Sequence, residues 1–194
     1  MTRIAEIIEA TTTRFVAGSY QMLDAPAFGA LVRVEGRDGC AAYGLVYEIS
    51  TGSREQGGRA VVRGRPGMYD EEIFAANPDL EAVLQTEFTA LTVGFCDGPV
   101  IRHHLPPQPP PIHYSVQQRD AAEIGRFTTR LDFLRALVNA ADVPADELIG
   151  AFLSQAAQAA PDRHAFLVRA GRQLAMLLRN DYQRLMALLE HLRP

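Results

Sequence analysis

Four arginines in one short segment are the side chains whose type and spacing most clearly suggest binding. They are Arg54, Arg59, Arg63 and Arg65. They follow the hydroxyl-rich stretch 50–53 and surround two adjacent glycines, whose backbone donors together with guanidinium forks can hold phosphate or carboxylate groups. We expect segment 54–65 to contact the acidic surface of a partner, because it has no aromatic side chain on which nucleic-acid bases could stack. A solvated loop and a nucleic-acid contact are the two alternatives.

Histidine, serine and aspartate side chains near a proline-rich stretch are the candidates for catalysis or metal binding. His103 and His104 are adjacent, and neighbours on a strand point to opposite faces, so they cannot easily share an ion. Ser115, His113 and Asp120 are the residue types of a catalytic triad, but they have neither a nucleophile elbow nor an oxyanion glycine. We therefore predict no catalytic residue and no metal site, and we expect the chain not to be an enzyme.

The basic residues are all arginine: 19 of them are present and no lysine. Schiff-base chemistry and the phosphate-binding lysine of a P-loop are thereby excluded, and we predict no cofactor. A net charge of −4 argues against bulk electrostatic binding to nucleic acid. Only Cys40 and Cys96 are present, far apart and outside any C-x-x-C pair, which favours two free thiols.

Targeting signals are not apparent in the sequence. An acidic residue, Glu6, comes early, and no apolar run is long enough for a signal peptide or a membrane span. We therefore expect a cytoplasmic protein without membrane insertion.

The first part of the chain, residues 1–115, has the pattern of a β domain with short apolar runs between Gly, Pro and Asp. Asp97-Gly98 between two such runs predicts a tight hairpin, and the glycines of segment 36–39 predict another turn. We expect short helices near 70–87, with Asp70 capping one and Pro78 beginning another. The predicted strands are 3–9, 13–16, 31–35, 42–49, 89–95 and 99–102.

The second part, residues 116–194, is rich in Ala, Leu and Arg and is predicted to be helical. A proline-rich stretch, 105–111, separates it from the β part and favours an extended, semi-rigid joint. We expect three helices, over 120–140, 144–159 and 161–192. The third would be long enough for part of its apolar stripe to face another chain. The predicted interface residues are Leu178, Tyr182, Leu185, Leu189 and Leu192.

Four segments of the β part resemble the HAS barrel. They are Ile4–Thr12, Ala25–Val32, Tyr43–Tyr47 and Leu105–Pro107. The HerA-type DNA translocases and the N-terminal domains of the ATP synthase α and β subunits share this barrel. In particular, the chain resembles stand-alone, barrel-only bacterial proteins of the group. The resemblance implies a six-stranded antiparallel barrel that makes subunit and partner contacts in a ring.

The sequence departs from that family where the motor domain would begin. It contains no G-x-x-x-x-G-K-[ST] string, so the ATPase activity of the translocases is not expected here. The sequence therefore predicts an α+β fold, a small barrel followed by a helical segment, that works as an assembly or adaptor protein. Its partners would be protein chains, in a homo- or hetero-oligomer that could be ring-like. The alternative is a nucleic-acid-associated accessory factor that binds through segment 54–65.

Overall fold

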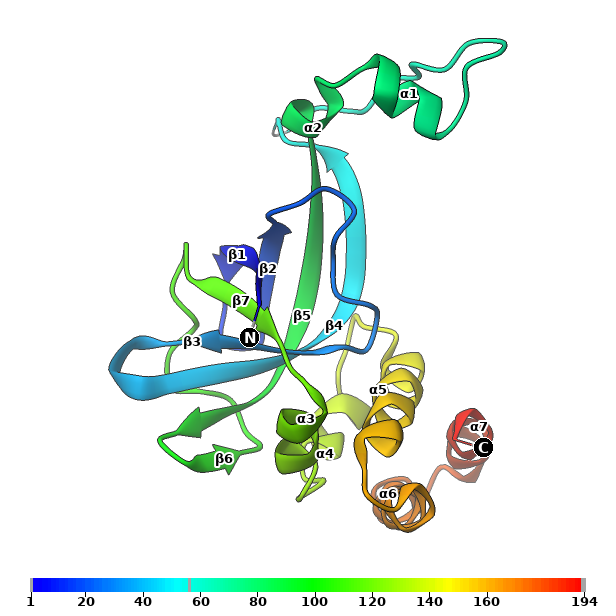
Figure 1. The fold of residues 1–194 in the computed structure, drawn as a ribbon. Helices are drawn as coiled ribbons and strands as arrows, with labels where there is room; N and C mark the ends of the chain where they lie inside the picture. The colour runs from blue at the N-terminus through cyan, green and yellow to red at the C-terminus, as the bar shows by residue number, and fades with distance from the viewer. Residues whose placement is uncertain (1, 56, 193–194) are drawn as a thin grey trace.

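Short runs of alternating apolar residues form the strands of a closed, six-stranded antiparallel barrel, as predicted (Figure 1). The computed structural model describes residues 2–55 and 57–192. Around the barrel the strands follow the order β2, β1, β7, β3, β4, β5, and pairing of β2 with β5 closes it. A further short strand, β6, pairs with the end of β5. The strands are β1 (Arg3–Ala10), β2 (Arg14–Ser19), β3 (Leu31–Glu35), β4 (Cys40–Ser53), β5 (Leu84–Asp97), β6 (Val100–Arg102) and β7 (Ser115–Gln118).

The barrel interior is a small hydrophobic core filled by side chains from several strands. Phe15, Phe88, Val32 and Val116 are all buried there. Gly44 on β4 faces the ring of Phe15, and a Cβ atom built at Gly44 would lie 2.7 Å from the Phe15 Cζ. The absence of a side chain at this position therefore gives the phenylalanine its space.

Two predicted turns connect neighbouring strands. Asp97 pairs with Val100, so β5 and β6 form the predicted tight hairpin, and Gly98 takes a positive φ of 57°. Between β3 and β4 the chain makes one 3₁₀ turn, η1 (Arg37–Gly39), whose Gly39 has a φ of 75°. Strands β4 and β5 are longer than their sequence pattern predicted, and this extension carries the segment described below.

In the C-terminal part, up to residue 192, the structure describes five helices rather than the three predicted. They are α3 (Ala121–Phe127), α4 (Leu134–Val138), α5 (Ala145–Ala159), α6 (Arg163–Leu177) and α7 (Tyr182–His191). The predicted helix over 120–140 is interrupted at 128–133, where Thr128 turns its hydroxyl back to the Ile124 carbonyl at 2.8 Å. Only the helix predicted over 144–159 has nearly the expected bounds.

The long helix predicted over 161–192 is wrong, because the chain turns back after α6. Asp181 caps the start of α7 by accepting a hydrogen bond from the Arg184 backbone N–H at 3.1 Å. The Arg184 side chain then pairs with Asp146 of α5 at 2.7 Å and donates to the Val138 carbonyl at 3.1 Å. These contacts hold α7 against the other helices, so no long continuous seam remains for a partner.

The helices cover one outer side of the barrel and share a core with it. Tyr43 and Leu45, which point outward from β4, are buried against Phe127, Phe133 and Phe152 of the helical part. The Phe127 and Phe133 rings lie 5.1 Å apart, in a tilted arrangement that suits aromatic pairs. The proline-rich stretch leads back into the barrel, since β7 follows it and begins at Ser115. The predicted domain boundary between residues 115 and 116 thus falls inside a barrel strand, β7.

Candidate functional site

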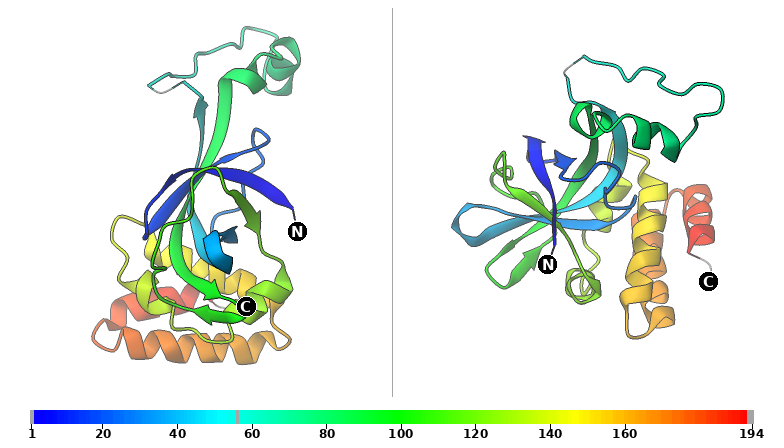
Figure 2. Two further views of the ribbon diagram at one scale, coloured as in Figure 1. Left: turned by 90° about the vertical axis from the view of Figure 1, so that its left-hand side faces the viewer. Right: turned by 45° about the horizontal axis from the view of Figure 1, so that its top comes forward.

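A projecting segment at one end of the molecule is the candidate functional site. Beyond the barrel, β4 and β5 continue as a two-stranded ribbon whose last pair is Ser53 with Leu84. Residues 54–83, which we call the arm, connect these two strands and extend away from the barrel (Figure 1). Figure 2 shows the same projection from two other directions.

The arm contains the two short helices that were expected near 70–87. They are α1 (Glu71–Ala76) and α2 (Leu80–Val83). Asp70 precedes α1, but its side chain makes no capping hydrogen bond, and α2 begins after Asp79 rather than at Pro78. The helical region ends at Val83 rather than near 87, because β5 starts at Leu84, and Phe88 of that strand lies in the barrel core.

The arm exposes large apolar side chains and has almost no core of its own. Among its described residues only Leu80 is buried, with 7% of its surface exposed. Val62 is 95% exposed, Val61 is 72% exposed and Tyr69 is 61% exposed, and Phe74 and Val83 are also exposed. Scattered single apolar residues are normal at a surface, but several on one projecting segment are typical of an interaction site.

The four predicted arginines all lie on the arm or at its base, but they do not converge on one point. The Arg54 Nε donates to the Leu84 carbonyl at 2.9 Å and ties the base of the arm to β5. Arg63 pairs with Asp79 at 3.0 Å and so connects the loop to the helical half. Arg59 and Arg65 are exposed, and neither forms an ion pair with any residue that the structure describes. Two of the four guanidinium groups are therefore available to a partner.

The predicted interface on the last helix is divided by the turn between α6 and α7. Leu178 and Leu192 are buried in the shared core, and Leu185 and Leu189 are half-buried against it. Tyr182 is 70% exposed. The four leucines therefore pack into or against the shared core, and Tyr182 is the exposed member of the five.

A buried polar cluster that the sequence pattern did not reveal joins the barrel to α3. The Tyr43 hydroxyl donates to the Glu123 carboxylate, and Arg33 lies 3.4 Å from the same carboxylate. Glu123 is only 5% exposed. Burial raises the pKa of Tyr43, and its hydrogen bond to Glu123 raises it further. The cluster fixes α3 on the outer wall of the barrel.

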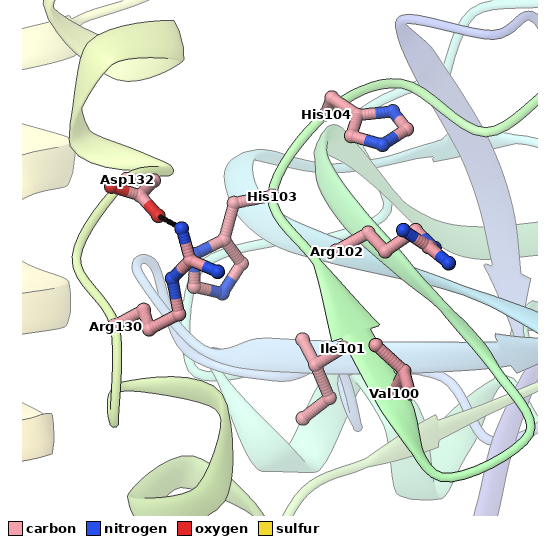
Figure 3. A pocket seen from close by; sticks show the side chains of 7 residues that line it. All are labelled: Val100, Ile101, Arg102, His103, His104, Arg130 and Asp132. Atoms are coloured by element: carbon pink, nitrogen blue, oxygen red, sulfur yellow. Dashed lines mark ion pairs between the residues drawn. The ribbon is translucent and has the colours of Figure 1, made fainter.

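A small pocket of about 210 Å³ lies between β6 and the turn that follows α3. Figure 3 shows the side chains that line it. His103 reaches toward Arg130 and Asp132, which pair with each other at 2.6 Å. The imidazole packs on the Phe127 ring at 4.7 Å and on the Phe133 ring at 5.3 Å. Burial lowers the pKa of His103, so a neutral ring that fills aromatic space accounts for the arrangement.

The residue types of a triad are not brought together. His113 contacts Glu6 at 2.5 Å, Ser115 contacts the Tyr20 hydroxyl at 3.1 Å, and Asp120 caps α3 through the Glu123 N–H. Cys40 and Cys96 are free thiols, and burial raises the pKa of Cys40, which lowers its reactivity. Within residues 2–55 and 57–192 no group of three or more metal-ligating side chains occurs.

Comparison with known proteins does not assign the chain to a family. No protein-family model matches the chain, and no curated protein matches it. The resemblance to the HAS barrel therefore stays a prediction. In the described part of the chain, no helix has the length and apolar character needed to span a membrane.

Proposed function

We propose that the chain is a non-catalytic assembly or adaptor protein of the cytoplasm that binds other protein chains through the arm. The observation that carries the proposal is the arm itself, residues 54–83, which projects from a closed barrel and leaves its apolar side chains exposed. A segment that buries so little of its own surface gains little stability from folding. Contact with a partner would bury Val61, Val62 and Tyr69 and would supply the missing apolar contact.

The charges of the arm support a protein partner better than a nucleic acid. Residues 54–83 contain four arginines and six acidic residues, so the net charge of the arm is 4 − 6 = −2. A phosphate backbone would be repelled by this excess, whereas a protein surface can offer groups of both signs. Arg59 and Arg65 are free to meet carboxylates of such a surface. The resemblance to ring-forming barrels supports a multi-subunit assembly within the same proposal.

An armless variant tests the proposal directly. Ser53 and Leu84 are paired across the ribbon, so an Asn-Gly turn can replace residues 54–83 without a change of strand register. The tagged wild-type chain and the armless variant would be used side by side for affinity capture from the native cell, followed by reconstitution with the purified partner. We expect partner proteins with the wild type and none with the armless variant.

A second pair of variants refines the assignment. Val61→Ser with Val62→Ser removes exposed apolar surface, and Arg59→Ala with Arg65→Ala removes the two unpaired cations; both should weaken the reconstituted complex. Equal capture of the same partners by the armless variant would overturn the proposal. Nucleic-acid binding that falls steeply with salt and disappears in the arginine variant would support the alternative instead.

A further inference from the structure

An open groove between α6 and α7 is a further exposed surface with an apolar lining. It has a volume of about 580 Å³. Its lining includes Leu167, Val168 and Leu189. Gly171 also lines it, and a Cβ at this position would make an ordinary contact of 3.4 Å with the Leu189 Cδ2. Side chains of phenylalanine or valine size can enter a groove of this kind.

The charge at the groove is of one sign. Arg163 and Arg172 line it on the α6 side together with His164, and none of the described lining residues is acidic. Both arginines are exposed, and neither forms an ion pair with another described residue. The groove therefore suits an apolar segment that carries unpaired carboxylates.

The helical half of the arm, residues 69–83, is a segment of that kind. It has five acidic residues and no basic one. Glu71 and Glu72 are exposed and form no ion pair within the described part of the chain. Phe74, which is 40% exposed, and Tyr69 supply apolar side chains close to these carboxylates. The groove and the segment are thus complementary both in charge and in apolar character.

The two surfaces cannot meet within one molecule of this shape. The arm extends from one end of the barrel, whereas α6 and α7 lie at the opposite end, as Figure 1 and the left view of Figure 2 agree. We infer that the acidic half of the arm of one molecule binds the α6–α7 groove of a second copy. Such a contact is head-to-tail, so it generates a ring where the rotation between neighbours closes and a filament where it does not.

This inference rests on the proposed function, since a second copy of the chain would be one partner of the arm. Charge reversal tests the inference separately from the proposed function. The arm variant is Glu71→Arg with Glu72→Arg, and the groove variant is Arg163→Glu with Arg172→Glu. Each alone places like charges at the contact, and we expect its self-association to weaken by more than about tenfold. Mixed together, the two variants present opposite charges at every contact, so association should return.

Sedimentation velocity on the purified proteins, at tens of micromolar and low salt, measures these states. The control variant, Arg135→Glu with Arg179→Glu, changes the net charge by the same amount as the groove variant but at residues away from the groove. It should associate like the wild type. Circular dichroism establishes that each variant is folded, which is expected because all the altered residues are exposed.

Recovery in the mixture, with loss in each variant alone, would support the arm-to-groove contact. The inference would be overturned by any one of three results: a strictly monomeric wild type, charge reversals without effect on association, or a mixture in which association does not return. None of these results affects the capture of other proteins by the arm, so the proposed function is judged by its own experiment. A small acidic ligand that binds the groove of a monomeric wild type would likewise count against the inference.

Discussion

Removal of the arm should leave the stability of the fold nearly unchanged, and the size of the effect can be worked out from the structure. Loss of Leu80, the side chain that is buried among the described residues of the arm, costs about 2 kcal/mol. Loss of the hydrogen bond from Arg54 to the Leu84 carbonyl costs about 1 kcal/mol. Shortening the connection from about 30 residues to 2 lowers the entropic cost of closing the loop, which stabilises the variant by about 2 kcal/mol.

The net destabilisation of the armless variant is therefore about 1 kcal/mol, which corresponds to a fall in Tm of roughly 2–4 °C for a domain of this size. Urea unfolding followed by circular dichroism, together with a thermal melt, measures both quantities. The matched control keeps the arm but carries Leu80→Ala, which should cost about 2 kcal/mol because it lacks the entropic gain of the shorter loop. A destabilisation above about 4 kcal/mol would refute the reasoning, because it would mean that the arm is part of the folded core.

Three further predictions concern the core and its titratable groups. Gly44→Ala forces a Cβ against the Phe15 ring and should destabilise the fold by about 1–3 kcal/mol in urea unfolding, with partial rescue by Phe15→Leu. Tyr43→Phe removes the donor to the buried Glu123 carboxylate and should lower the free energy of unfolding by about 1.5–3 kcal/mol. Because the pKa of Tyr43 is raised in the folded protein, the wild type should also lose stability as the pH rises above about 10. The variant should lose less stability over the same pH range. The pKa of His103 is lowered in the folded protein, so unfolding takes up a proton and stability should fall as the pH drops below about 6.5. His103→Phe should reduce that fall, and thermal melts between neutral and mildly acidic pH would measure the difference.

The barrel could be predicted from the sequence because its strands carry local signals. Asp97-Gly98 specifies a tight hairpin whatever lies around it, and the alternation that precedes it identifies β5. The start of β5 was harder to predict, since Leu84 and Phe88 have a four-residue spacing that suits a helix equally well. The pairing of Ser53 with Leu84 shows that this segment is a strand and not a helix, and that pairing is a contact between residues far apart in the sequence.

The helical part was predicted less well because leucine spacing continues through a turn. Leu174, Leu178 and Leu185 keep helical steps, but Asp181 caps a new helix between them. An Asn-Asp pair inside a leucine-rich run is a cap signal that could have indicated this break. The burial of Glu123 could not be foreseen, since a glutamate in the first turn of a helix is normally exposed and only the docking of α3 on β4 encloses it.

Closure of the barrel explains why the candidate binding surfaces lie on added elements. A closed sheet has no free edge, so the barrel itself offers little to a partner strand. The most exposed large apolar side chains, Val61 and Val62, lie on the arm that extends from β4 and β5, and the α6–α7 groove has a mainly apolar lining. Stability and assembly should therefore separate in experiments. Core substitutions such as Gly44→Ala would lower the free energy of unfolding, whereas changes at Glu71 or Arg172 would alter only association.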